Sequence, residues 1–130
     1  MDYLEMKGLI RRLDYIFDIH FYTEMPYQGL HDPETTPIVD LKGLFLEENK
    51  TYEAHIRFIG VEGLYIDRLW HGNSPTLDLI DREEEGWEQK YELDDVEGDI
   101  RLYCDEVEVI SVKESEILIE KEKGIIDTER

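Results

Sequence analysis

The stretch YEAHIRFI, residues 52–59, alternates apolar and polar side chains from residue 52 to residue 58, and this alternation decides the fold class. The apolar side chains are Tyr52, Ala54, Ile56 and Phe58, and the polar ones between them are Glu53, His55 and Arg57. A period of two places the two sets on opposite faces of a half-buried antiparallel strand. The preceding stretch IVDLKGLFL, 38–46, predicts the hairpin partner of this strand, joined to it by the polar turn EENK at 47–50.

Further short strands are predicted toward the C-terminus. They are LYIDRLW (64–70), TLDLID (76–81), WEQKYEL (87–93), DIRLYCD (99–105) and EVEVISV (106–112). In DIRLYCD the apolar side chains Ile100, Leu102 and Cys104 share one face, as they would above a core. Residues 115–123 suit either a strand or a short helix, and both alternatives stay open. The whole pattern predicts about eight strands at intervals of roughly 8–12 residues.

The N-terminal segment has a different period, with apolar side chains every three or four residues. These side chains are Met6, Leu9, Ile10, Leu13, Ile16 and Phe17. Such spacing predicts an amphipathic helix, and Asp2 followed by Glu5 has the spacing of a capping box. We expect this helix at about 2–18, with a short strand after it.

These patterns together predict an α+β fold that is mostly β. We expect an antiparallel β-sheet or sandwich of about eight short strands with one N-terminal helix. The β region should span about 38–121, and a frayed C-terminal tail should follow at about 122–130. With 130 residues and no linker-like stretch, the chain 1–130 is expected to form a single domain.

The composition combines a substantial apolar content with a very acidic charge. Hydrophobic residues make up 41% of the chain, too many for a disordered protein, and the net charge is -19. Ten acids and two bases lie between Asp81 and Asp99, so this segment supplies -8 of the charge and the rest of the chain supplies -11. Such a field repels nucleic acid and anionic membranes and attracts basic proteins. Solubility alone is the alternative explanation.

Cysteine usage and hydropathy bear on the compartment. Cys104 is the only cysteine, so no intrachain disulfide forms. The N-terminus MDYLEMKGLI lacks the positive charge of a secretory signal, and no stretch approaches the roughly 20 apolar residues of a membrane span. We therefore expect a cytoplasmic protein that does not enter the membrane; its oligomeric state is not predicted.

The segment DREEEGWEQKYE, 81–92, matches the spacing of an EF-hand calcium loop. The matching residues are Asp81, Glu83, Glu85, Gly86 and Glu92. An EF-hand needs a helix on each side of the loop, whereas the flanking stretches TLDLI and WEQKYEL alternate with the period of strands. The segment therefore predicts a β-hairpin with a charged turn, and no metal site is expected.

Candidate catalytic groups are few. The pair His31-Asp32 lies in a proline-rich loop, and together with His71 it could line a pocket for a small ligand or a catalytic centre. Loop-capping hydrogen bonds are the alternative role of this pair. Cys104 lies on the apolar face of its predicted strand, as a structural thiol does, and the chain contains no nucleophile-elbow or phosphate-loop motif. We expect no enzymatic activity and no cofactor.

A protein-binding surface is the stronger hypothesis. The acidic hairpin carries aromatic side chains beside its carboxylates, and rings supply contact area while acids attract a basic partner. The predicted contact residues are Glu83, Glu84, Glu85, Trp87, Tyr91, Asp94 and Asp95. Tyr65 and Tyr103 oppose the apolar faces of their strands, so they either belong to an exposed binding surface or are buried in a second core layer.

The chain also resembles a family of small immunity proteins encoded beside bacterial polymorphic toxins, catalogued as immunity protein fifty. The resemblance rests on His31-Asp32, on the run FIGVEGLYI at 58–66, on Asn73 in HGNSP, on GDIRLYC at 98–104 and on the closing VEVISV. It covers roughly residues 28 to 113. The resemblance implies a non-enzymatic protein that binds and neutralises a toxin domain by covering its basic surface.

Overall fold

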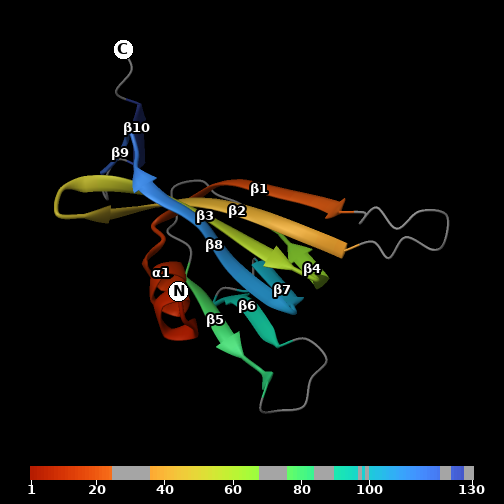
Figure 1. Ribbon diagram of the computed structural model, residues 1–130. Helices are drawn as coiled ribbons and strands as arrows, with labels where there is room; N and C mark the ends of the chain where they lie inside the picture. The colour runs from red at the N-terminus through yellow and green to blue at the C-terminus, as the bar shows by residue number, and fades with distance from the viewer. Residues whose placement is uncertain are drawn as a thin grey trace.

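A computed structural model of the chain describes residues 1–24, 36–67, 76–83, 90–96, 98, 100–120 and 124–127. Two four-stranded antiparallel sheets and one N-terminal helix make up most of this part of the chain (Figure 1). The predicted α+β, mostly β architecture is confirmed. Ten strands are present within the described residues, where about eight were predicted.

Sheet A has the strand order β1-β2-β3-β8. Its strands are β1 (Tyr15–Glu24), β2 (Thr36–Glu47), β3 (Lys50–Ile59) and β8 (Glu106–Glu114). The predicted hairpin is present, because β2 pairs with β3 and Glu47 lies opposite Lys50. Glu48 and Asn49 between them both have positive φ, 50° and 66°, as a two-residue hairpin turn requires. On β3, Ala54, Ile56 and Phe58 are fully buried, as the alternation predicted.

Sheet B has the order β4-β7-β6-β5. Its strands are β4 (Glu62–Ile66), β7 (Ile100–Cys104), β6 (Tyr91–Asp95) and β5 (Leu77–Asp81). The predicted burial of Ile100, Leu102 and Cys104 is confirmed. Strand β6 begins at Tyr91 and ends at Asp95, later at both ends than the predicted strand at 87–93.

A third, two-stranded sheet follows at the C-terminus. It consists of β9 (Ile117–Glu120) and β10 (Gly124–Asp127), which pair antiparallel. Residues 117–120 are therefore strand, one of the two alternatives left open for 115–123, and residues 121–123 lie outside the described part of the chain. The tail expected to fray from about 122 includes a paired strand, because Gly124–Asp127 finds its hydrogen-bonding partner in β9.

Helix α1 (Tyr3–Arg12) begins as predicted and ends early. Asp2 and Glu5 form the capping box, with the Asp2 carboxylate accepting from the Glu5 N–H at 2.8 Å. The expected end near residue 18 is wrong: the backbone is extended at Leu13, and Ile16 lies opposite Gly43 in the β1–β2 ladder. The sequence is ambiguous from residue 16 to residue 22, because its apolar side chains also alternate with polar ones, and hydrogen bonding to β2 decides in favour of a strand.

The core lies between the two sheets and is closed on one side by α1 (Figure 1). Sheet A contributes Val39, Leu41, Ile56 and Phe58; sheet B contributes Leu79, Leu93, Leu102 and Cys104; and the helix contributes Met6, Leu9 and Ile10. These side chains form one connected cluster. Within the described residues, no helix is long and apolar enough to cross a lipid bilayer.

Candidate protein-binding surface

The acidic segment 81–92 joins two paired strands. Asp81 at the end of β5 lies opposite Tyr91 at the start of β6, and the Arg82 N–H donates to the Lys90 carbonyl at 2.6 Å. The predicted hairpin is therefore confirmed. An EF-hand requires helices at both ends of its loop, so this segment is not one. No group of three or more His, Cys, Asp or Glu side chains within the described ranges is arranged to hold a metal ion.

Glu92 has an internal role. Its carboxylate falls at the twelfth position of the EF-hand template, where a calcium ligand would lie, but it accepts hydrogen bonds from Arg82, with Nη2 at 3.0 Å and Nε at 3.3 Å. The residue is only 6% exposed. A buried carboxylate is stable when a cation compensates it, and Arg82 supplies that cation.

Several of the predicted contact residues also hold the fold together. Asp95 is 6% exposed, and its Oδ1 accepts from the backbone N–H and the hydroxyl of Thr76, both at 3.3 Å. The Asp95 side chain therefore offers almost no surface to a partner, and its contact role stays a prediction. Asp94 is half-buried, 3.6 Å from the Arg101 guanidinium.

Tyr91 is half-buried and packs against the helix. Its ring stacks on the ring of Tyr3 with centroids 6.0 Å apart. Burial, together with the negative charges of Asp81 and Glu83, raises the pKa of the Tyr91 hydroxyl. Of the predicted contact residues that the structure describes, only Glu83 is exposed.

The remaining predicted site residues lie outside the described part of the chain. They are Glu84, Glu85 and Trp87 in the hairpin turn, and His31, Asp32 and His71 of the alternative pocket. Their roles stay predictions. Of the two tyrosines with two possible roles, Tyr65 is exposed on β4, and Tyr103 is half-buried with its ring against Gly63.

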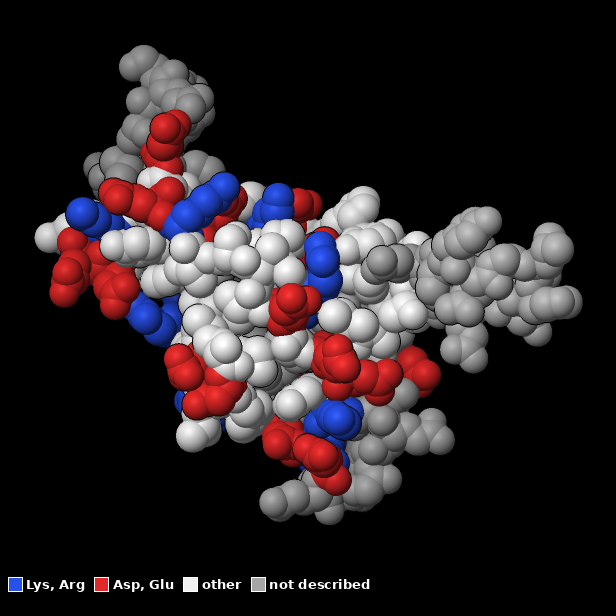
Figure 2. Space-filling model, in the orientation of Figure 1, with Lys and Arg blue, Asp and Glu red and all other residues white. Residues whose placement is uncertain are grey.

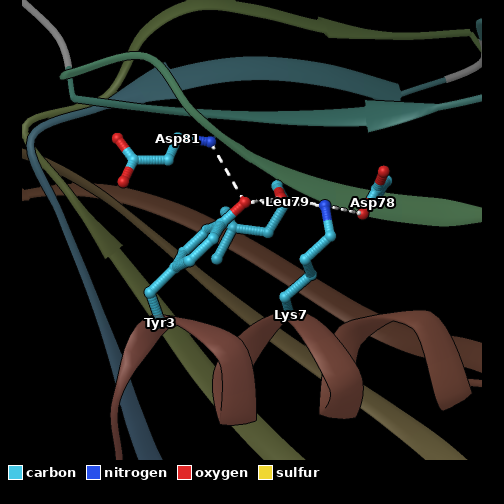
Figure 3. Close-up of polar contacts among 5 residues, drawn as sticks. All are labelled: Tyr3, Lys7, Asp78, Leu79 and Asp81. Atoms are coloured by element: carbon cyan, nitrogen blue, oxygen red, sulfur yellow. Dashed lines mark hydrogen bonds and ion pairs between the residues drawn. The ribbon is translucent and has the colours of Figure 1, made fainter. Parts of the chain in front are cut away.

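One edge of sheet B is closed by the helix (Figure 3). The Tyr3 hydroxyl donates to the Leu79 carbonyl at 2.8 Å and accepts from the Asp81 N–H at 3.2 Å. The Lys7 ammonium donates to the same carbonyl at 2.9 Å and lies 2.8 Å from the Asp78 carboxylate. These two side chains occupy the hydrogen-bonding groups that a further strand beside β5 would need.

Within the described residues, both end strands of sheet A, β1 and β8, have a side that pairs with no other strand. Strand β8 pairs with β3 on one side and lies at the end of the strand order, where a sheet exposes unpaired backbone groups. Its apolar side chains Ile110 and Val112 are 39% and 41% exposed. The acids of β8 and its two ends are all exposed: Asp105, Glu106, Glu108, Glu114 and Glu116.

Figure 2 presents the molecule with β8 in front, in the orientation of Figure 1. A largely uncharged area extends across this side of the surface, and Asp and Glu side chains border it together with Lys and Arg side chains. From its sequence, EVEVISV was predicted to be a strand and was not predicted to be a binding surface. The density of acids along a strand with exposed apolar residues was the signal for this surface, but its position at a sheet edge could not be read from the sequence.

A polar cluster occupies the outer face of sheet A. The Asp40 carboxylate accepts from Arg57 (Nε at 2.9 Å, Nη2 at 3.3 Å) and from the Tyr22 hydroxyl at 3.1 Å, and His55 Nε2 lies 3.4 Å away. Burial alone would raise the pKa of Asp40, but these hydrogen bonds and the Arg57 charge outweigh it and lower the pKa. A carboxylate held ionised in this way is a structural anchor and a poor proton donor at neutral pH.

Cys104 is fully buried in the core. Burial, with a smaller contribution from the Asp105 charge, raises the pKa of its thiol to about 12. Such a thiol is neutral and unreactive at physiological pH, so the predicted structural role is confirmed.

Comparisons with known proteins return no match: no family model, no curated protein and no solved structure is significantly similar to the chain. The observations that bear on function are therefore the net charge, the exposed side chains of β8 and the position of β8 at the end of sheet A.

Proposed function

We propose that the chain is an acidic, non-enzymatic binding protein that docks on a basic protein. In its most specific form the proposal is a bacterial cytoplasmic immunity or inhibitor protein that neutralises a toxin domain by covering its basic surface. A net charge of -19 supports a basic partner, because nucleic acid and anionic lipid would be repelled.

The observation that carries the proposal is the unequal distribution of acidic and basic side chains over the molecule. Many cations of the described residues are engaged with acids of the same chain: Lys7 with Asp78, Arg12 with Glu47, Arg57 with Asp40, Arg82 with Glu92, Arg101 with Asp94 and Lys113 with Glu53. The stretch 105–116 around β8 contains five acids and Lys113 as its single base, a local charge of -4. This excess of acid faces solvent.

The physical mechanism has two parts. Opposite charges speed the encounter of two proteins, and at physiological salt this attraction acts over about 8 Å before screening weakens it. Exposed apolar groups such as Ile110 and Val112 then hold the complex once water has left the interface. The acids mainly set the association rate, and the apolar residues mainly set the lifetime of the complex.

Two matched triple variants test the proposal. One is Glu106→Gln, Glu108→Gln, Glu114→Gln on β8; the other is Glu83→Gln, Glu84→Gln, Glu85→Gln in the hairpin, the surface that the sequence predicted. Each changes the net charge by +3, from -19 to -16. The proposal predicts that a gene beside that of this chain encodes a basic effector domain, and this domain, rendered inactive for purification, is the binding partner for the measurement.

Association rates are measured by stopped flow at low and at high salt. We expect the β8 variant to associate roughly tenfold more slowly at low salt and to show a flatter salt dependence, with a smaller change for the hairpin variant. A larger effect of the hairpin variant would move the docking surface to residues 83–85. An effector that forms no complex with the wild-type chain, and whose toxicity the chain does not relieve on co-expression, would refute the proposal.

A further inference from the structure

We propose that β8 is a docking strand: an extended segment of the basic partner pairs with it and becomes a fifth strand of sheet A. This inference rests on the proposed function and specifies how the partner binds. In this mode main-chain hydrogen bonds contribute affinity, and the side chains on either face of the added strand contribute specificity.

The pairing with β3 determines which backbone groups of β8 are open. The Ser115 N–H donates to the Thr51 carbonyl at 2.8 Å, and hydrogen-bonded pairs alternate with non-bonded pairs along an antiparallel ladder. Lys113 opposite Glu53 therefore bonds to β3, whereas the register places Val112 opposite Ala54 and Glu114 opposite Tyr52 in non-bonded pairs. The N–H and C=O groups of Val112 and Glu114 consequently point away from β3, toward the position of an added strand.

Apolar contact area is available beside these groups. The side chain of Val112 is 41% exposed and that of Ile110 is 39% exposed. Val107 and Val109, further along the strand, are half-buried against the core. A strand paired with β8 would pack its own side chains against these, so the apolar face of sheet A would become one strand wider.

The charge of β8 indicates which kind of segment would pair with it. Three exposed acids on the strand, Glu106, Glu108 and Glu114, would lie beside the side chains of an added segment, while Lys113 is already 3.3 Å from Glu53. Opposite charges on adjacent strands attract and like charges repel. The fitting occupant is an extended segment in which Lys or Arg alternates with β-forming residues. A second copy of this chain would place acids against acids.

The other edges are less suited to strand addition. Tyr3 and Lys7 occupy the edge of β5. Strand β4 spans only Glu62–Ile66, whereas β8 spans Glu106–Glu114; the ladders of both strands contain a register shift, so their difference is one of length. Strand β1 also has an open side, but it lacks the run of exposed acids that β8 has.

The test uses the full chain and a short synthetic peptide that alternates Lys with Val. A peptide that alternates Glu with Val is the control for charge. A third peptide is the Lys-Val peptide with N-methyl groups on alternate residues. It lacks the N–H donors along one of its own two edges. Binding is measured by fluorescence anisotropy, and backbone hydrogen exchange is followed by NMR.

We expect the Lys-Val peptide to bind, and to slow exchange of the Val112 and Glu114 amides by at least tenfold. The Glu-Val peptide should not bind, and N-methylation should weaken binding roughly tenfold or more because the ladder bonds are lost. This comparison is made on the wild-type chain, so it does not depend on a variant that folds.

The matched protein variants are Val112→Pro and Val112→Ala. Proline removes the outward N–H without breaking a bond to β3, and alanine removes the side-chain bulk while keeping the N–H. We expect proline to weaken binding of the Lys-Val peptide roughly tenfold more than alanine does. Equal effects of the two variants, exchange protection confined to other strands, a Lys-Val peptide that does not bind, or dimerisation of the free chain through β8 would each overturn the inference. The stopped-flow experiment with the whole effector domain tests the proposed function separately.

Discussion

The Tyr3 hydroxyl donates a hydrogen bond to the Leu79 carbonyl at 2.8 Å and accepts one from the N–H of Asp81, two residues further along β5, at 3.2 Å (Figure 3). These are backbone groups that a neighbouring strand would otherwise bond. A side chain of the N-terminal helix thus closes the edge of sheet B. The contact joins residues 76 positions apart in the chain.

Replacing Tyr3 by Phe tests this relationship. The variant keeps the ring that stacks on Tyr91 and removes only the hydroxyl, so we expect the free energy of unfolding to fall by about 1 kcal/mol, a typical hydrogen-bond contribution. Hydrogen exchange at the Asp81 amide should accelerate. Leu4→Ala, at a 73% exposed position of the same helix, should change stability by less than about 0.5 kcal/mol. Equal stability of the two variants would show that the hydroxyl contributes nothing.

Gly43 is required by close packing. A Cβ at this position would lie 2.8 Å from the Tyr15 carbonyl oxygen and 2.9 Å from a Leu13 methyl carbon. Because the nearest atom belongs to backbone, we expect Gly43→Ala to destabilise the protein by about 1–3 kcal/mol. Gly8→Ala is the matched change in open space on helix α1 and should stabilise by up to about 1 kcal/mol. Urea denaturation measures both; a neutral Gly43→Ala would contradict the packing argument.

Asp40 should make stability depend on pH. Its pKa in the folded protein lies below the ordinary value of 3.8, despite burial, because Arg57 and Tyr22 donate hydrogen bonds to the ionised form. The resulting stabilisation is complete above the unfolded-state pKa and is lost as pH falls through the folded-state pKa. We expect Asp40→Asn to cost about 1–3 kcal/mol at neutral pH.

The difference between wild type and Asp40→Asn should shrink as the pH falls below 3.8, and chemical denaturation across acidic pH would follow it. Asp18→Asn, at an exposed position on the neighbouring β1, is the control and should show little change at any pH. A difference for Asp40→Asn that stays constant to well below 3.8 would argue against an ionised, hydrogen-bonded carboxylate.

Cys104 should resist thiol reagents in the folded protein. With a pKa of about 12 and a fully buried side chain, its thiolate is scarce and inaccessible at pH about 8. We expect negligible labelling by an aromatic disulfide reagent until denaturant is added, when one equivalent should react. Rapid labelling of the native chain would place the thiol near the surface.

The β-strands could be predicted from the sequence where only one face of the strand is buried. In YEAHIRFI the period of two follows from the pleat of a single strand, so local sequence was enough to predict that Ala54, Ile56 and Phe58 face the core. The helix end was not predictable in this way. Ile16 fits a helical face and a strand face equally, and its position opposite Gly43 on β2 decided the outcome.

The docking surface was harder to predict than the helix end. It depends on which carboxylates form contacts inside the folded chain and which remain on the surface. Asp94, Asp95 and Glu92 add to the charge of the acidic segment as much as Glu83 does, yet the pairing of β6 with β5 and β7 places them beside Asp78, Leu77 and Tyr103. Only strand pairing distinguishes an acid that anchors the sheet from one that faces a partner.

The sequence by itself determined the mostly β architecture, the core faces of β3 and β7, the capping box of α1 and the acidic charge, since each depends on neighbouring residues or on composition. The tertiary structure alone decided that α1 closes the edge of β5 and that β8 ends sheet A. The order of strands depends on contacts between distant segments, and β8 lies beside β3, roughly 50 residues earlier in the chain. Backbone groups are open or paired according to that order, so the surface offered to a partner is a property of the assembled sheet.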